Sequence, residues 1–372
     1  MTPEQLKAFR DQIDAYDDQI LPLLVERSRL VQQVGLNKHK VGAPVFRPER
    51  EVAIIERMCA LNRSLGGPLP DQSIAAIWLE VISGCRALER VMRVSYLGPA
   101  GTYSEQAVRT LFGHRVEGIP CASLDEAVAL AERGDADAAL LPVENSIEGT
   151  VGRTLDLFLQ TPLRISAEVS IPIHHGLLSQ APDRSSIRRV VAHAQALAQC
   201  QGWLRDHLPG VEQIAVSSNG EAARMASEDP SLAAIAGQTA AQHYGLRTLA
   251  DRIEDDPSNR TRFAAIGDFT PDGCGVDQTS LILSVPDQAG AMLSLIEPMA
   301  RHGVSMKRFE SRPARQRSSA DGWEYFFYVD LVGHQTDSQV ALALAEIRSR
   351  ASFYKLLGSY PLFERLTLPS HV

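Results

Sequence analysis

The sequence lacks three features: a long apolar run, a leader-like N-terminus and a paired-cysteine motif. No apolar stretch approaches the roughly 18 residues that a membrane-spanning helix needs. The opening segment MTPEQLKAFRDQ has no apolar signal-peptide core. The cysteines contain no C-x-x-C pair and are scattered at Cys59, Cys85, Cys121, Cys200 and Cys274. These absences predict a cytoplasmic protein with reduced thiols, no membrane span and no metal centre.

Excess positive charge and a dinucleotide fingerprint are also missing. Lys and Arg total 37 against 45 Asp and Glu, a net charge of −8, so no nucleic-acid surface is predicted. The turn at residues 98–101 reads G-x-x-G rather than G-x-G-x-x-G, which argues against a nicotinamide site. With 372 residues, 44% of them hydrophobic, the chain is long enough for two to four domains.

The first segment, residues 1–93, is typical of helices alone. Apolar residues recur at three- and four-residue steps across residues 6–34, although Pro22 inside this pattern costs about 3 kcal/mol or forces a kink. A second helix is expected from Pro48 and a third is expected to be capped by Asp71. Three helices, one of them very long, make a poor monomeric core. We therefore expect the long helix to pack against a second copy of itself in a homodimer.

The pattern changes after residue 93. Strands and helices alternate through residues 94–270, which predicts an α/β domain with a largely parallel sheet and room for two lobes. A linker rich in Gly, Pro and Asp covers 270–278. Residues 278–365 show the β-α-β-β-α-β order of a ferredoxin-like domain. The predicted protein is multidomain: all-α over 1–93, α/β over 94–270 and α+β over 278–365.

Three basic residues lie on the long predicted helix: Arg10, Arg27 and Lys38. Arg27 and Lys38 are 11 residues apart and share a face, whereas Arg10 lies 17 residues from Arg27, roughly 25 Å along the axis. One small ligand cannot touch both arginines in one chain. They are either solvated charges or parts of a site that takes Arg10 from the partner subunit of an antiparallel pair.

The strings FRDQIDAYDDQILPLLVER, VGLNKHK and PVFRPERE resemble the all-helical chorismate mutase family over about 90 residues. A Claisen rearrangement needs a folded dicarboxylate and cations near the breaking ether oxygen. The resemblance implies that Arg10 and Arg27 clamp the carboxylates, that Lys38 donates to the ether oxygen and that Glu51 holds the ring hydroxyl. The implied site residues are Arg10, Arg27, Lys38, Arg47, Glu51, Cys85 and Glu89.

Two departures from the family pattern concern this site. Glu89 stands where several relatives carry glutamine, and an ionised carboxylate cannot donate a hydrogen bond, so Glu89 has to be protonated to help. Arg47 stands where some relatives carry a carboxylate. An insertion near residues 66–67 would shift the third helix, in which case Ser83 takes the role of Cys85.

Polar side chains also gather in three strings of the α/β segment, YLGPAGTYSEQA, LLPVENSIEGTV and SNRTRF. The first sets hydroxyls at a helix N-terminus, a usual anion seat. The second ends a strand with polar groups, where open α/β sheets bind ligands. Each string taken alone is also compatible with an ordinary cap. The candidate residues are Thr102, Ser104, Asn145, Ser146, Thr261 and Arg262.

Together with SIPIHHGLL and HAQALAQC, these strings resemble the prephenate dehydratase family over residues 94–268, with Ala194 replacing the usual proline. The resemblance implies a two-lobed fold, similar to periplasmic binding proteins, with the site in the cleft. Prephenate loses carbon dioxide and hydroxide as its ring becomes aromatic, so no nucleophile is needed. We expect Thr261 to donate or relay a proton to the leaving hydroxyl, and Arg262 or Arg260 to bind a carboxylate.

Residues 278–365 resemble an ACT regulatory domain. The string DQAGAML places a glycine at a strand-to-helix turn, where a ligand can approach the backbone closely. FESRP ends the following strand with an acid and an arginine, as in phenylalanine-sensing dehydratases. A dimerisation module without ligand is the alternative. The implied effector residues are Gly290, Ala291, Met292, Leu293, Glu310, Ser311 and Arg312.

The whole chain thus resembles the bifunctional chorismate mutase–prephenate dehydratases, which are multifunctional isomerase and lyase enzymes of phenylalanine biosynthesis. The resemblance implies chorismate and prephenate as substrates, feedback inhibition by phenylalanine, a homodimer or higher homo-oligomer, and neither metal nor organic cofactor. Three alternatives stay open. They are a dehydratase acting on arogenate, a non-enzymatic amino-acid-responsive binding protein, and a mutase fused to a prephenate dehydrogenase, which would need the missing nicotinamide fingerprint.

Overall fold

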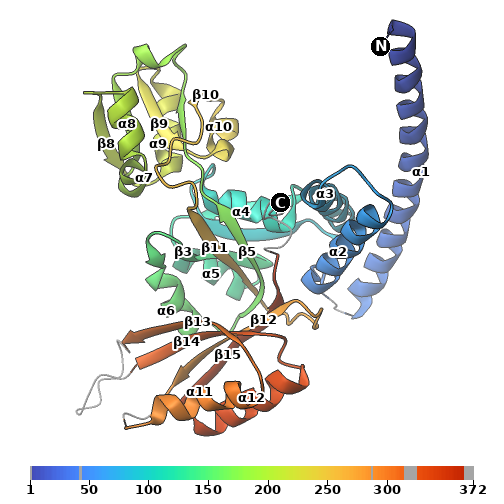
Figure 1. Cartoon of the computed structure of the whole chain (residues 1–372), viewed down its shortest axis with the longest axis vertical. Coiled ribbons are helices and arrows are strands. Elements are labelled where there is room, and N and C mark those ends of the chain that lie inside the picture. Colours follow the sequence, from blue (N-terminus) through green and yellow to red (C-terminus); the bar gives the residue numbers. More distant parts are fainter. Residues whose placement is uncertain (1, 42–43, 286–287, 314–324, 364–372) are drawn as a thin grey trace.

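A three-helix arm, a two-lobed α/β body and a C-terminal α+β domain follow one another along the chain (Figure 1). The computed structural model describes residues 2–41, 44–285, 288–313 and 325–363, without the side chains of 37–41. No helix of this described part is both long and apolar enough to cross a membrane.

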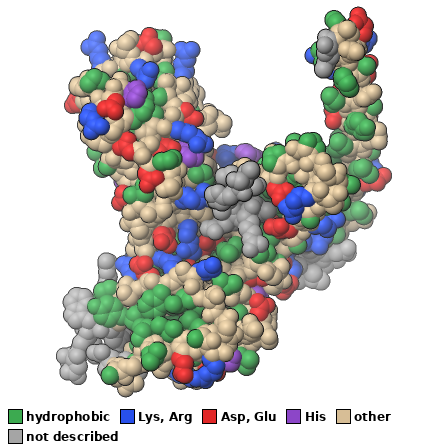
Figure 2. All heavy atoms as spheres, in the orientation of Figure 1, with side chains coloured by type: hydrophobic (Ala, Val, Ile, Leu, Met, Phe, Trp, Pro, Cys, Tyr) green, Lys and Arg blue, Asp and Glu red, His purple; other side chains and the backbone are tan. Residues whose placement is uncertain are grey.

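The arm consists of α1 (Pro3–Val41), α2 (Pro48–Ser64) and α3 (Asp71–Glu89). Pro22 lies inside α1 without ending it. Asp71 is the first helical residue rather than the cap, which is Pro70, and its carboxylate pairs with Arg63. The N-terminal part of α1 projects from the molecule and carries exposed apolar side chains (Figures 1 and 2). Their exposed fractions run from 41% at Leu6 to 66% at Tyr16.

Lobe one is a mixed sheet in the order β2-β1-β3-β11-β5, with β4 beside β3. Its strands are β1 (Met92–Leu97), β2 (Val116–Cys121), β3 (Ala138–Asn145), β4 (Gly149–Thr150), β5 (Arg164–Pro172) and β11 (Arg260–Gly267). Its helices are α4 (Tyr103–Phe112), α5 (Leu124–Glu132) and α6 (Gly152–Gln160). Buried apolar side chains on both faces of the sheet form its core.

Lobe two holds a second mixed sheet in the order β10-β6-β9-β7-β8. Its strands are β6 (Gly176–Ser179), β7 (Arg189–His193), β8 (Glu212–Val216), β9 (Leu232–Ala236) and β10 (Arg247–Ala250). Its helices are α7 (Ala194–Gln199), α8 (Gln201–His207), α9 (Asn219–Glu228) and α10 (Gln238–Tyr244), with a 3₁₀ turn at Arg184–Ser186.

The prediction of a largely parallel sheet is wrong. In lobe one, β11 pairs antiparallel with both β3 and β5. The reason is topological, because the chain leaves lobe one through β5 and returns through β11 in the opposite direction. In lobe two, β6 is antiparallel to both of its neighbours.

The C-terminal domain has the predicted β-α-β-β-α-β order. Its elements are β12 (Asp277–Ser284), α11 (Ala291–Arg301), β13 (Met306–Pro313), β14 (Tyr325–Val332), α12 (Ser338–Arg350) and β15 (Phe353–Pro361). The antiparallel order β13-β14-β12-β15 confirms the ferredoxin-like fold. Helices α11 and α12 cover one face. The other face meets lobe one, where the Tyr328 hydroxyl donates to the Leu155 carbonyl at 2.8 Å.

Candidate active sites

The two lobes enclose a cavity of about 280 Å³. Lobe one lines it with the C-terminal ends of β1 and β3 and the N-terminal ends of β11 and α4. Lobe two lines it with the N-terminal ends of α7, α9 and α10. Four of the predicted site residues, drawn from three separate strings of the sequence, meet on its wall: Thr102, Ser104, Asn145 and Thr261.

Four helix N-termini converge on this cavity. The N-cap residues of α4, α7, α9 and α10 all line it: Thr102, His193, Ser218 and Gly237. Among the described lining residues there is neither lysine nor arginine. Helix N-termini present backbone N–H groups and a partial positive charge. The cavity is therefore suited to an anion held by backbone dipoles rather than by cationic side chains.

Gly101 brings the two lobes close together at the start of α4. Its φ of +82° suits glycine, and a Cβ at this position would lie 3.1 Å from the Ala240 Cα of lobe two. The glycine thus allows Thr102 and Ser104 to reach the cleft.

Asn145 and Thr261 face each other across paired strands β3 and β11. The Asn145 Oδ1 accepts the backbone N–H groups of Ile147 and Glu148, both at 3.0 Å, which fixes the orientation of the amide. Its Nδ2 therefore donates to Thr261 Oγ1 at 2.9 Å. Because the hydroxyl oxygen accepts this bond, its proton is left for another acceptor, and Thr261 lines the cavity.

A chain of hydrogen-bonded side-chain amides extends from Asn145, and the sequence motifs do not predict it. Asn145 Nδ2 also donates to Asn259 Oδ1 at 2.8 Å, and Asn259 Nδ2 donates to Gln199 Oε1 at 3.1 Å. These contacts fix the Gln199 amide, whose buried Nε2 has no hydrogen-bond partner within the described structure. Gln199 lines the cavity, so this donor is placed for a ligand. The string HAQALAQC contained Gln199, but only the fold brings it beside Asn259.

His175 and Tyr103 close this chain. His175 Nε2 lies 2.9 Å from Gln199 Oε1, which requires a proton on Nε2. The Tyr103 hydroxyl donates to the His174 carbonyl at 2.8 Å and also lies 2.8 Å from His175 Nδ1. Burial lowers the pKa of His175 and raises that of Tyr103 well above its ordinary value. Both side chains are therefore held neutral on the cavity wall.

Ser146 and Arg262 do not line the cavity, which corrects two expectations. Ser146 Oγ accepts the backbone N–H of Arg260 at 3.0 Å, so this serine fixes the start of β11. The Arg262 side chain leaves the opposite face of the sheet and binds Glu168 at 2.7 Å. Arg260 likewise donates to Ser170 at 2.7 Å. The physical reason is strand alternation, which sends the two neighbours of a cleft-facing threonine to the other face.

A second, smaller cavity of about 90 Å³ lies among the three helices of the arm. It brings together five predicted residues: Arg27, Arg47, Glu51, Cys85 and Glu89. Arg27 Nη1 donates to Cys85 Sγ at 2.8 Å and its guanidinium lies over the Trp78 ring. Glu51 is buried and paired with Arg86. Arg47 is partly exposed and lies 2.7 Å from Asp272, beyond the arm.

The register of α3 follows from these contacts. Cys85 and Glu89 face the cavity, whereas Ser83 Oγ accepts the backbone N–H of Arg115 at 3.1 Å on the two-lobed body. The Ser83 alternative therefore does not fit. Glu89 packs against Gly35 of α1, where a Cβ would lie 2.7 Å from the Glu89 Cγ.

Of the predicted residues of the arm whose side chains are described, Arg10 does not line this cavity. Arg10 lies on the exposed N-terminal part of α1. Lys38 belongs to the last turn of α1, and its side chain lies outside the described residues. The site of one chain is thus lined without Arg10.

The predicted effector residues occupy two places in the C-terminal domain. Gly290 has a φ of +84° and is the N-cap residue of α11, and Leu293 is 72% exposed. Arg312 donates to the Gly152 carbonyl and lies 3.5 Å from Asp156, both in lobe one. Among the described contacts, Arg312 thus binds the two-lobed body rather than residues 290–293.

Known proteins are similar to both the helical arm and the two-lobed body. Residues 9–90 match the family model "Chorismate mutase type II" and residues 94–270 match "Prephenate dehydratase". The bifunctional chorismate mutase/prephenate dehydratase of Neisseria gonorrhoeae is 46% identical over 96% of this chain and 97% of its own. That of Aquifex aeolicus is 39% identical over 96% and 98%. The solved prephenate dehydratase of Arthrobacter aurescens, in complex with L-Phe, is 35% identical with a TM-score of 0.67, covering 75% of this chain and 92% of that one. The chain belongs to the family of bifunctional chorismate mutase/prephenate dehydratases.

Proposed function

We propose that this chain converts chorismate to prephenate in its helical arm and prephenate to phenylpyruvate in the cleft between its lobes. One observation carries the second step. The Thr261 hydroxyl, oriented by Asn145, faces a cavity on which four helix N-termini converge. Prephenate is a dicarboxylate with a ring hydroxyl that must leave, so its site needs anion-binding groups beside a proton donor.

In the dehydratase step, Thr261 donates its proton to the leaving hydroxyl as carbon dioxide departs. The bond from Asn145 Nδ2 polarises the threonine hydroxyl and strengthens it as a donor. The α4 N-terminus and Gln199 Nε2 bind the substrate's oxygen atoms. Neutral His175 and Tyr103 hold the amide chain in place.

The mutase step takes place in the cavity of the arm. Arg27 binds a substrate carboxylate there, and Glu51 binds the ring hydroxyl. Arg10 completes the site from the partner subunit of a homodimer. The exposed apolar side chains along the projecting part of α1 support this pairing, because such a row is buried when two long helices pack together.

Two further assignments complete the proposal. The C-terminal domain binds phenylalanine and lowers dehydratase activity. The solved complex of the Arthrobacter aurescens prephenate dehydratase with L-Phe supports phenylalanine as the ligand. The protein works in the cytoplasm, which the scattered, unpaired cysteines support.

The test is a coupled assay on the purified chain. Chorismate is supplied alone, and prephenate and phenylpyruvate are followed by chromatography, with and without phenylalanine. We expect chorismate to disappear, prephenate to appear transiently and phenylpyruvate to accumulate. Arogenate is supplied in a parallel reaction, because an arogenate-specific enzyme would release phenylalanine from it and leave prephenate untouched. Failure to consume chorismate and prephenate would overturn the proposal.

A further inference from the structure

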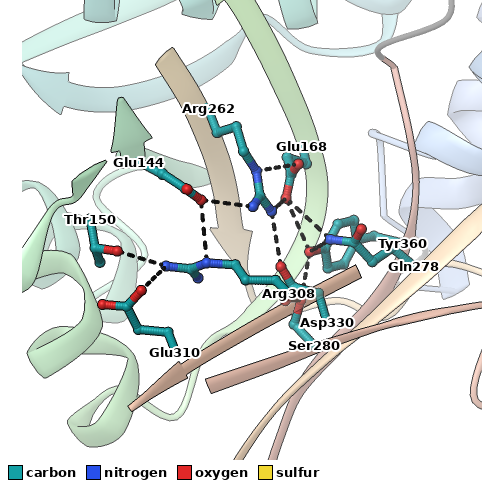
Figure 3. Close-up of polar contacts among 10 residues, drawn as sticks. All are labelled: Glu144, Thr150, Glu168, Arg262, Gln278, Ser280, Arg308, Glu310, Asp330 and Tyr360. Atoms are coloured by element: carbon teal, nitrogen blue, oxygen red, sulfur yellow. Dashed lines mark hydrogen bonds and ion pairs between the residues drawn. The ribbon is translucent and has the colours of Figure 1, made fainter. Parts of the chain in front are cut away.

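Behind the cleft, Arg262 and Glu144 connect the two site-bearing strands to the C-terminal domain (Figure 3). Arg262 follows Thr261 in β11, and Glu144 precedes Asn145 in β3. The strands pair so that Thr261 lies opposite Asn145 and Arg262 lies opposite Glu144. Because side chains alternate along a strand, one pair faces the cleft and the other faces away from it.

A first link, from Arg262 to Asp330, joins lobe one to β14. The Arg262 guanidinium binds Glu168 through two hydrogen bonds of 2.9 and 2.7 Å and lies 3.0 Å from Asp330 Oδ2. Burial alone would lower the pKa of Arg262, but the facing carboxylates of Glu168 and Asp330 raise it. The guanidinium thus stays charged, and any movement of Asp330 changes the environment of a buried cation.

A second link joins Glu144 to the neighbouring strand β13. Arg308 Nε lies 3.3 Å from Glu144 Oε2, and Arg308 Nη2 donates to Thr150 Oγ1 at 3.2 Å. Glu144 Oε2 also accepts from Arg262 Nη1 at 3.1 Å. Two adjacent strands of the C-terminal sheet therefore each hold one of the two strands that carry Thr261 and Asn145.

The C-terminal side of the first link is itself fixed. Asp330 Oδ1 accepts from Ser280 Oγ at 2.6 Å, and Ser280 Oγ lies 2.7 Å from the Tyr360 hydroxyl. That hydroxyl donates to Glu168 Oε2 at 3.2 Å (Figure 3). Because β12, β14 and β15 all contribute to this buried network, a shift of the C-terminal sheet has to move Arg262 with it.

The second link adjoins the predicted effector string. Glu310, two residues after Arg308 on β13, lies 3.8 Å from the Arg308 guanidinium. Arg312, two residues further on, contacts Gly152 and Asp156 at the start of α6. A ligand that changes the position of β13 would therefore act on Arg308 as well.

We propose that Asp330 and Arg308 are positioning residues for the dehydratase site and carry the effector signal to it. Through Arg262 and Glu144 they hold the strands that set Thr261 opposite Asn145. Effector binding displaces the contact between Thr261 and Asn145. The inference rests on the proposed function. Neither residue lines the cleft, so both act through their partners.

The experiment separates phenylalanine binding from phenylalanine inhibition. In the full-length protein, Asp330→Asn removes the charge facing Arg262 while keeping an acceptor for Ser280, and Arg308→Gln removes the second link. Glu346→Gln is the matched control, because Glu346 also pairs with arginines of this domain, Arg301 and Arg350, on the helical face. The dissociation constant of phenylalanine is measured by calorimetry, and its half-inhibitory concentration is measured with prephenate as substrate.

We expect the half-inhibitory concentration to rise about fivefold or more in Asp330→Asn and Arg308→Gln. Their dissociation constants should stay within about twofold of wild type, and Glu346→Gln should behave as wild type. Circular dichroism checks folding, and Arg308→Gln serves alone if Asp330→Asn does not fold, because its partner Glu144 is one-third exposed. A folded variant whose half-inhibitory concentration changes no more than its dissociation constant overturns the inference. A wild type without dehydratase activity overturns the proposed function instead.

Discussion

Thr261 and Arg262 are consecutive residues of β11 whose side chains serve opposite faces of one sheet. Thr261 Oγ1 lies 2.9 Å from Asn145 Nδ2 on the cleft wall, and Arg262 Nη2 lies 3.0 Å from Asp330 Oδ2 at the junction with the C-terminal domain. One strand thus joins the proposed proton donor to the proposed regulatory domain. The arrangement also explains why a threonine stands between two arginines: of the three, only the threonine lines the cleft.

The mutase site should be complete only across a dimer. Arg10 and Arg27 are roughly 25 Å apart on one helix, and Arg10 is absent from the cavity that Arg27 lines. Arg10→Ala and Arg27→Ala proteins should each be inactive as mutases. After subunit exchange, a mixture should recover about a quarter of wild-type activity, because half of the dimers then hold one intact site of two. No recovery despite exchange proven by mass spectrometry would contradict the dimer model.

The side chain at position 89 should matter to mutase activity as a hydrogen-bond donor. Glu89 lines the cavity where a donor is needed, and a glutamine amide donates there through its Nε2. We expect Glu89→Gln to keep or raise the mutase rate and Glu89→Leu, which cannot donate, to lower it. Chorismate disappearance measured for the two variants tests this. Equal rates in both variants would place Glu89 away from the ether oxygen.

Gly35→Ala should separate helix stability from mutase activity. Alanine favours an α-helix over glycine by about 1 kcal/mol, but a Cβ at this position would lie 2.7 Å from the Glu89 Cγ and displace it. A displacement of about 1 Å in an active site can cost 10²-fold in rate. We expect α1 to stay folded, mutase kcat to fall by one to two orders of magnitude and dehydratase activity to be unchanged. Unaltered mutase kcat would show that Glu89 has room to move without loss.

Because His175 is neutral in the folded protein, both stability and dehydratase activity should decline at acid pH. Burial lowers the pKa of His175 from 6.5, so below that pH the unfolded chain takes up a proton before the folded chain does. Stability should therefore fall as pH drops from 6.5 toward the lower folded-state pKa, and dehydratase activity should fall with it as the ring gains a charge beside Tyr103 and Gln199. In His175→Gln both pH dependences should flatten. Thermal melting and prephenate turnover across this range provide the check, and an equally steep decline in the variant would implicate another group.

Much of the fold and part of each site could be predicted from the sequence. Helical periodicity marked α1 despite Pro22, and strand–helix alternation marked the two lobes. The motif strings placed Thr102, Asn145 and Thr261, which the structure brings to one cavity. These features are local, so a short window of sequence contains them.

The rest required the fold. Gln199 and Asn259 are 60 residues apart in the chain and meet because the segment that returns to lobe one passes beside the end of α7, where the Asp255 N–H donates to the Gln199 carbonyl. Arg262 lies on the face opposite Thr261, because neighbours along a strand alternate between the two faces of a sheet and adjacency in sequence is therefore not adjacency in the site. Its partner Asp330 lies in another domain, which local pattern could not indicate.

The account's central claim is tested most directly by the rate at which Thr261→Ala converts prephenate to phenylpyruvate. Chorismate consumption by the same protein serves as the folding control, and Thr261→Ser keeps a hydroxyl. Loss of one transition-state donor costs about 10²–10³ in rate. The account predicts a dehydratase rate lowered at least that far in Thr261→Ala, partial activity in Thr261→Ser and near-wild-type mutase activity in both. A Thr261→Ala protein that keeps its mutase activity and more than about a tenth of the dehydratase rate would contradict the account.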